Sequence, residues 1–211
     1  RIELDPAESL RELLARITPG NLKKSFFTLG GSEANENAVK IARMASGKHK
    51  ILARYRSYHG GTAMSMGLTG DPRRWPNEPQ PPGIMRIPDP YYYRCRLPIS
   101  EDAFMQECLN QTEDVIKFEG ARNIAAILVE TVTGTNGIIV PTRAYYEGLR
   151  ALCDKYGIYL ILDEVMCGFG RTGRMFACEH YGITPDIMTM AKGLTSSYLP
   201  LGNCIVSEEI G

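Results

Sequence analysis

The feature that most constrains the fold is the pattern of the second half of the chain. Short apolar segments, which are typical of buried strands, occur there before and after a segment with the periodicity of a helix. Strands are expected at residues 124–131, 158–163, 187–191 and 202–206, and a helix is expected at residues 142–156. Strands that alternate with helices build a parallel sheet with helices on both faces. The pattern therefore predicts an α/β fold with three layers, αβα.

The first half adds elements of the same two kinds. Apolar residues spaced along one face of a helix predict two helices, which end at Pro19 and at Gly47. Further strands are expected at residues 25–29, 51–55 and 84–87. With the four strands of the second half they predict a mostly parallel, seven-stranded sheet, so that one α/β domain accounts for the whole chain.

A third helix is expected between Ser100, which serves as its N-cap, and Gly120. Its candidates for the buried face are Phe104, Cys108, Val115 and Phe118. The stretch before this helix, residues 70–98, holds eight of the thirteen prolines of the chain. Because proline removes a backbone donor and restricts its neighbour, most of this stretch is expected to be a loop at a functional site or at an interface.

Composition excludes several classes of function. The 24 lysines and arginines are balanced by 24 acidic residues, whereas binders of nucleic acid or of anionic membranes need an excess of positive charge. The longest apolar runs fall short of the roughly 20 residues of a membrane helix, and the first residues carry no apolar segment of signal-peptide type. The six cysteines lack zinc-site spacing, so we expect reduced thiols, no metal site and a cytoplasmic protein.

The turn Gly30-Gly31-Ser32 lies between a predicted strand and a predicted helix. Free backbone N–H groups and the helix dipole attract an anion at such a point, and glycine lets a phosphate approach the backbone closely. The Ser32 hydroxyl adds a further hydrogen-bonding group. A tight turn with an N-cap is the alternative, because neither the dinucleotide pattern G-x-G-x-x-G nor a P-loop is present.

Two charged residues directly follow apolar strands. Asp163 and Lys192 are both expected at the carboxyl edge of the sheet, where ligands bind in open α/β folds. A buried carboxylate there needs a cation or several donors, and a lysine in a cleft can act as an amine nucleophile. A structural carboxylate and a solvated lysine are the alternatives.

Tyr58 and His59 follow a third predicted strand, where their rings either stack on a planar ligand or belong to the core. In combination, the candidate groups match the needs of pyridoxal 5′-phosphate (PLP). Its phosphate needs an anchor, its ring a face to stack on, its pyridine nitrogen an Asp, and its aldehyde a lysine.

These motifs, in this order, resemble the class III (subgroup II, ω-type) pyridoxal-phosphate-dependent aminotransferases of fold type I. The resemblance extends over residues 1–211. It rests on Gly30-Gly31-Ser32-Glu33-Ala34-Asn35-Glu36, on Tyr58-His59-Gly60, on Glu130 with Gly134, Gly137 and Pro141, on Asp163-Glu164-Val165 followed by Gly168-Phe169-Gly170-Arg171-Thr172-Gly173, and on Ala191-Lys192-Gly193.

The resemblance implies a role for each matching residue. Gly31 and Ser32 would bind the phosphate, and Lys192 would form a Schiff base with the aldehyde. Tyr58 would stack on one face of the ring and Val165 would pack on the other. The remaining implied positions are Asp163 at the pyridine nitrogen, His59 and Glu130 in support, and Met166 where many relatives have Gln.

The resemblance also implies transamination with ping-pong kinetics, in which an amino group moves from an ω-amino acid or amine to a keto acid such as pyruvate. Family members are roughly twice this length and form homodimers with the site at the interface, so residues 1–211 are expected to be the PLP-binding large domain without the C-terminal small domain. Other PLP reactions (decarboxylase, aminomutase or phospho-lyase) and an inactive PLP-binding fragment remain alternatives. A nucleotide-binding Rossmann enzyme is a weaker one.

Overall fold

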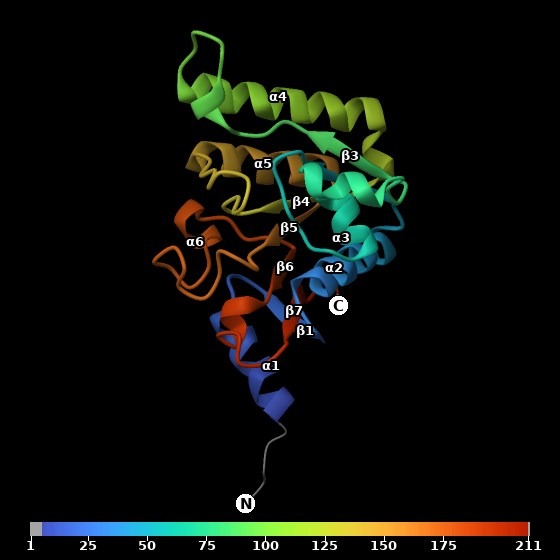
Figure 1. Cartoon of the computed structure of the whole chain (residues 1–211), viewed down its shortest axis with the longest axis vertical. Coiled ribbons are helices and arrows are strands. Elements are labelled where there is room, and N and C mark those ends of the chain that lie inside the picture. The colour runs from blue at the N-terminus through green and yellow to red at the C-terminus, as the bar shows by residue number, and fades with distance from the viewer. Residues whose placement is uncertain (1–5, 211) are drawn as a thin grey trace, which may run out of the picture.

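The computed structural model describes residues 6–210, with side chains from residue 9 onward, and its centre is one seven-stranded sheet (Figure 1). The strand order is β1-β7-β6-β5-β4-β2-β3. Only β7 runs antiparallel to its neighbours, so the prediction of a mostly parallel seven-stranded sheet is confirmed. The strands are β1 (Leu22–Thr28), β2 (Lys50–Arg54), β3 (Ile84–Ile87), β4 (Ile124–Glu130), β5 (Tyr159–Asp163), β6 (Ile187–Met190) and β7 (Gly202–Ser207).

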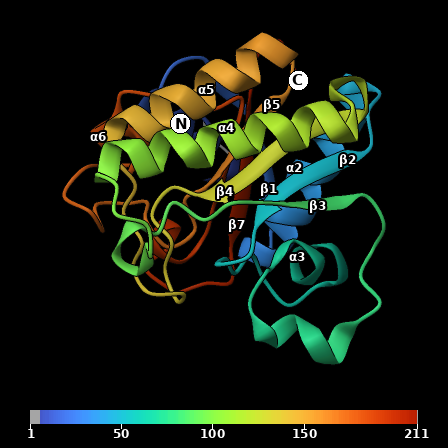
Figure 2. The same ribbon diagram turned by 90° about the horizontal axis from the view of Figure 1, so that it is seen from above.

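Helices cover both faces of this sheet. Figure 2 shows α4 and α5 on one side of the strands and α2 with α3 on the other, as the expected αβα layering requires. The α-helices are α1 (Pro6–Ile17), α2 (Gly31–Ser46), α3 (Ala63–Leu68), α4 (Glu101–Glu119), α5 (Arg143–Tyr156) and α6 (Cys178–Tyr181). None of the helices within residues 6–210 has the length and apolar character needed to cross a bilayer.

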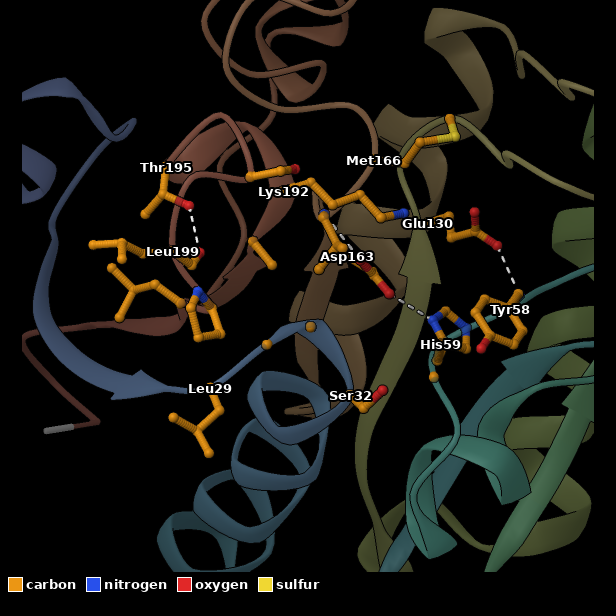
Figure 3. Close-up of a pocket in the computed structure, with 18 of the residues that line it drawn as sticks. Leu29, Ser32, Tyr58, His59, Glu130, Asp163, Met166, Lys192, Thr195 and Leu199 are labelled. Atoms are coloured by element: carbon orange, nitrogen blue, oxygen red, sulfur yellow. Dashed lines mark hydrogen bonds and ion pairs between the residues drawn. The ribbon is translucent and has the colours of Figure 1, made fainter.

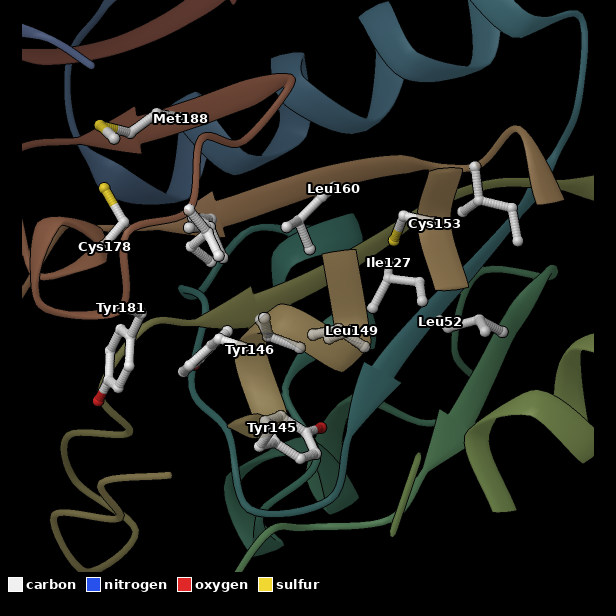
Figure 4. Packing of buried hydrophobic residues seen from close by; sticks show 14 of the residues in the cluster. Leu52, Ile127, Tyr145, Tyr146, Leu149, Cys153, Leu160, Cys178, Tyr181 and Met188 are labelled. Atoms are coloured by element: carbon white, nitrogen blue, oxygen red, sulfur yellow. The ribbon is translucent and has the colours of Figure 1, made fainter. Parts of the chain in front are cut away.

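The core consists of two apolar layers, one on each face of the sheet. Successive strand residues alternate between them, so Leu160 packs in the layer of α4 and α5 while Ile161 packs in the layer of α2. Figure 4 shows Leu160 with Ile127 and Leu149 in the first layer. All seven residues of β4 are buried, which explains its uninterrupted apolar sequence.

Helix α4 has the predicted caps, and three of the four residues predicted for its buried face, Phe104, Cys108 and Val115, pack on the core. The Ser100 hydroxyl accepts a hydrogen bond from the Ala103 backbone N–H, and Gly120 ends the helix. Phe118 was expected to point inward, and this prediction is wrong because its side chain is 90% exposed. Two residues turn a helix by about 200°, so Phe118 lies opposite the buried Ile116.

Residues 70–98 are mostly irregular, as their prolines predicted. The exceptions are the predicted strand β3 and two short 3₁₀ helices, η1 (Pro72–Asn77) and η2 (Tyr92–Arg94). All six cysteines are free thiols, and five of them are buried. The short helices α3 and α6 were not predicted, because segments this short carry too little periodicity.

Candidate active site

A cavity of about 620 Å³ opens at the carboxyl ends of the strands (Figure 3). Loops that follow β1, β2, β4, β5 and β6 line it, so five separate segments of the chain meet there. Every predicted site residue is among the lining residues: Gly31, Ser32, Tyr58, His59, Glu130, Asp163, Val165, Met166 and Lys192.

The first turn of α2 forms one wall of the cavity. A Cβ atom on Gly31 would lie 2.8 Å from Cγ1 of Val165, so only glycine allows this approach. The Ser32 hydroxyl accepts a hydrogen bond of 3.1 Å from the Gly61 backbone N–H, which leaves its own proton to be donated. Since the first N–H groups of a helix have no partner within it, this wall suits an anion.

Asp163 ends β5 and is 3% exposed, but three donors surround its carboxylate. Oδ1 accepts from the Val165 backbone N–H at 3.0 Å. Oδ2 accepts from Nδ2 of Asn35 at 2.9 Å and lies 2.8 Å from Nδ1 of His59. These contacts fix the orientation of the carboxylate at the cavity wall.

Asn35 connects this carboxylate to the neighbouring strand, and sequence reasoning gave it no role. Its Nδ2 also donates to the His59 carbonyl at 2.8 Å, while its Oδ1 accepts from the Thr189 hydroxyl at 2.8 Å. Asn35 and Thr189 are both buried. The available signal was a polar residue at a core position of an amphipathic helix, because Asn35 stands beside the buried Ala34 and Ala38.

His59 has a buried side chain with one ring nitrogen on Asp163. Within residues 6–210 its Nε2 has no hydrogen-bond partner. A buried polar atom without a partner is rare in native folds and is costly unless a ligand or water satisfies it. His59 therefore acts at the cavity wall through its contact with Asp163, while its Nε2 is enclosed by the surrounding side chains.

Glu130 ends β4 and ties two of the loops together. Its Oε1 accepts from the Tyr58 backbone N–H at 2.9 Å, and its Oε2 accepts from the Gly134 backbone N–H at 2.8 Å. Burial raises the pKa of Glu130, although His59 and these backbone donors act in the opposite direction. Glu130 thus holds the backbone of Tyr58 at the cavity.

Lys192 follows β6 and begins the 3₁₀ helix η4 (Lys192–Leu194). Figure 3 shows its side chain extending into the cavity between Asp163 and Met166. Its φ angle of 43° lies in the left-handed region, which is unfavourable for a residue with a Cβ atom. Such strain is typical of functional sites, where the surrounding structure enforces it.

Glu164, next to Asp163 in sequence, belongs to a different environment. Its carboxylate accepts hydrogen bonds from the Ala177 and Cys178 backbone N–H groups at 3.0 and 2.9 Å. Glu164 is buried and does not line the cavity. It anchors the loop between β5 and α6, so the two adjacent acids have separate tasks.

The cavity therefore combines an amine, an oriented carboxylate, an anion-binding turn and an aromatic ring on one sheet edge. The amine can attack a carbonyl group or take up a proton. The carboxylate can hold a positive charge close to the amine, and the ring offers a face to a planar ligand.

A family model described as "Aminotransferase class-III" matches residues 2–211. A probable aminotransferase of Mycobacterium tuberculosis is 42% identical over 212 residues, covering 97% of this chain and 46% of that protein. Gamma aminobutyrate transaminase 2 of Solanum lycopersicum is 40% identical over 208 residues, covering 95% and 45%. The chain thus spans about half the length of these curated relatives.

Solved structures of transaminases share the fold of this chain. An (S)-enantioselective omega-transaminase from Thermomicrobium roseum superimposes with a TM-score of 0.95 at 42% identity, covering 98% of this chain and 48% of that one. The taurine:2-oxoglutarate aminotransferase from Bifidobacterium kashiwanohense, solved in complex with PLP and glutamate, gives a TM-score of 0.92 at 42% identity, with the same two coverages of 98% and 48%.

Proposed function

Because the chain belongs to the class-III aminotransferase family, we propose that residues 1–211 are the PLP-binding large domain of a transaminase that moves an amino group from an ω-amino acid or amine to a keto acid such as pyruvate. The family's C-terminal small domain would lie outside these residues. The observation that carries this proposal is the cavity in which the Lys192 amine, the Asp163 carboxylate and the Ser32 hydroxyl come together. The named substrates of the relatives, gamma-aminobutyrate and taurine, support the ω-amino class of donor.

The residues of the cavity fit PLP. Helix α2 begins at Gly31, so its first backbone N–H groups and the Ser32 hydroxyl would hold the phosphate. Tyr58 and Val165 supply the surfaces for the two faces of the ring, and His59 supports Asp163 through its Nδ1. Asp163 is the group for the pyridine nitrogen, with Glu130 in support.

Bound PLP supplies an electron sink for the electron pair that remains when a proton leaves the donor carbon. Lys192 has two tasks in this proposal. Its Nζ would hold the cofactor at the aldehyde, and the same amine, once free, would serve as the general base for the proton on the donor carbon. Asp163 would pair with the pyridine nitrogen and favour its protonated form. Met166 contributes apolar contact only, since a thioether donates no hydrogen bond.

We also propose a homodimer with the cavity at its interface. Three apolar residues at the cavity are strongly exposed, Leu29 at 69%, Tyr198 at 90% and Leu199 at 68%. Exposed apolar side chains that gather at one place commonly contact a partner. Sedimentation analysis measures the oligomeric state, and a monomer at all concentrations contradicts the proposed dimer.

The free thiols support a cytoplasmic location, which cell fractionation tests.

The first experiment is the visible absorption spectrum of the purified chain with added PLP, before and after borohydride reduction, followed by peptide mapping. We expect a covalent adduct on Lys192, which disappears in Lys192→Ala and persists in the control Lys40→Ala on the exposed side of α2. A folded chain that forms no adduct contradicts the proposal for these residues.

Product analysis then defines the reaction. Transamination requires a keto acid and yields its amino acid, so added pyruvate should become alanine. Carbon dioxide without any need for pyruvate identifies a decarboxylase. An isomerised product identifies an aminomutase, and release of phosphate from the donor identifies a phospho-lyase. Retained PLP with no product from any donor identifies an inactive binding fragment.

A further inference from the structure

Arg73, in the 3₁₀ helix η1, lies against the ring of Tyr58. Its guanidinium carbon is 3.9 Å from the ring centroid. The other cation-to-ring contacts among residues 6–210 span 4.6 to 6.0 Å. A guanidinium this close to a ring face is attracted by the negative face of the ring, so this contact holds the Tyr58 ring and not merely its backbone.

The guanidinium is itself held from two sides. Its Nε donates to both carboxylate oxygens of Asp71 at 3.0 Å, and its Nη2 also bonds Asp71. The same Nη2 donates to the Thr135 hydroxyl at 2.7 Å, in the loop after β4. Arg73 therefore joins two loops at the place where the Tyr58 ring meets them.

Asp71 is suited to this task because it is buried yet keeps its charge. Burial alone would raise the pKa of Asp71, but hydrogen bonds from Arg73 and Asn136 outweigh this effect and hold the pKa below its ordinary value. Asn136 donates to Oδ2 of Asp71 at 3.1 Å. The carboxylate stays ionised at neutral pH, so the bonds that fix the guanidinium stay charge-assisted.

We propose that Arg73 is a positioning residue that fixes the Tyr58 ring in the orientation from which it contacts the cofactor. The proposal rests on the proposed function, because Tyr58 matters only if its ring faces PLP. Glu130 holds the backbone of Tyr58, and Arg73 supplies the missing constraint on the ring. A purely structural role for Arg73 would instead act through Asp71 and Thr135 alone, without involving the ring.

Fluorine NMR of the unliganded chain labelled with 3-fluorotyrosine tests the contact directly. The Tyr58 resonance is identified by its loss in Tyr58→Phe. We expect Arg73→Ala to shift and reshape this resonance. The matched control is Arg74→Ala in the same helix, because Arg74 bonds Glu78 and the Gly70 carbonyl. A Tyr58 resonance that is unchanged in Arg73→Ala overturns the proposal.

PLP affinity, measured by absorbance titration, tests the consequence for the site. Arg73→Ala should weaken binding by about threefold to tenfold, the range given by one cation–π contact. The same substitution in a Tyr58→Leu background should cause no further loss. Arg73→Lys, which keeps the charge but not the fork toward Asp71 and Thr135, should recover part of the affinity.

Two results of the titration overturn the proposal. Equal losses in both backgrounds show that Arg73 does not act through the ring, and tighter binding in Arg73→Ala shows that Arg73 obstructs the cofactor. If the unmodified chain fails to bind PLP, the proposed function fails for this chain. The fluorine resonance still decides whether Arg73 holds Tyr58, so the two failures are distinguishable.

Discussion

The bodies of strands β4 and β5 differ sharply from their carboxyl ends. Within the bodies every side chain from Leu160 to Leu162 is fully buried among apolar neighbours. At the ends the register pairs Glu130 with Asp163, so two acids stand side by side after apolar strands. The favourable burial that stabilises the fold lies in the bodies, whereas the buried charges that suit chemistry lie at the ends.

The backbone shows the same division. Five residues other than glycine among residues 6–210 adopt a positive φ, and all of them lie in the loops that follow β4, β5 and β6: Ile138, Phe169, Lys192, Ser196 and Ser197. Unfavourable backbone conformations persist only where the surroundings enforce them. The apolar strand bodies thus supply the rigidity that the strained ends require.

The largest expected effect is chemical and belongs to a strand end. Lys192→Ala should slow the conversion of a donor amine to its carbonyl product by about a hundredfold to ten-thousandfold, the usual contribution of a general base. Single-turnover measurement on PLP-loaded protein checks this, with Lys40→Ala as the control. Unfolding free energy should change little, since the Lys192 side chain is exposed. A variant that retains its rate contradicts the assignment.

The next effect belongs to a strand body. Leu160→Ala should lower the free energy of unfolding by about 2–5 kcal/mol, because it removes a fully buried side chain and leaves a cavity. Urea denaturation measures this loss. The PLP spectrum of the folded fraction should be unchanged, since Leu160 does not line the cavity. If Leu160→Ala loses less free energy of unfolding than Lys192→Ala does, the contrast between the strand bodies and their carboxyl ends is contradicted.

The third effect is a pH dependence of the free energy of unfolding. It arises at Glu164, which follows strand β5 but does not line the cavity. Burial raises the pKa of Glu164, so the folded chain keeps a proton that the unfolded chain loses above about pH 4.3. Stability from this group is therefore lost as pH rises from that value to the raised pKa. Glu164→Gln should flatten the decline by up to about 1.4 kcal/mol per pH unit, measured by denaturation at several pH values.

The comparison also shows what the sequence could predict. Strand β4 was located at residues 124–130, against an expected 124–131, because a strand buried on both faces is continuously apolar. Strand β1 alternates instead, and it begins at Leu22 and not at the expected residue 25. Lys192 and Asp163 were found because each directly follows a continuously apolar run. Helix faces were less certain: in α4 the polar Thr112 shares the buried face while Phe118 points to solvent.

Contacts between distant segments could not be predicted from one sequence. Asn35 and Asp163 lie 128 residues apart, and Arg73 and Thr135 lie 62 apart. Neither pair has a local pattern, because the sheet order and not the chain brings its members together. Asp163, Lys192 and Tyr58 could be assigned to one edge because strand ends share it, and Glu130, Val165 and Met166 were added by the family resemblance. The bonds that orient these residues are a property of the folded chain.

The smallest expected effect concerns Lys192, where backbone strain can be measured separately from the chemistry of the amine. Lys192 has a φ of 43°, which glycine adopts freely and alanine does not. The free energy of unfolding of Lys192→Gly should therefore exceed that of Lys192→Ala by about 1 kcal/mol, the usual penalty of a left-handed residue with a Cβ atom. Urea denaturation of both variants measures this difference. Both variants lack the amine, so both should lack the reduced PLP adduct. Equal stability of the two variants would show that the strand end stores no strain at Lys192, and the contrast between strand bodies and ends would then rest on side chains alone.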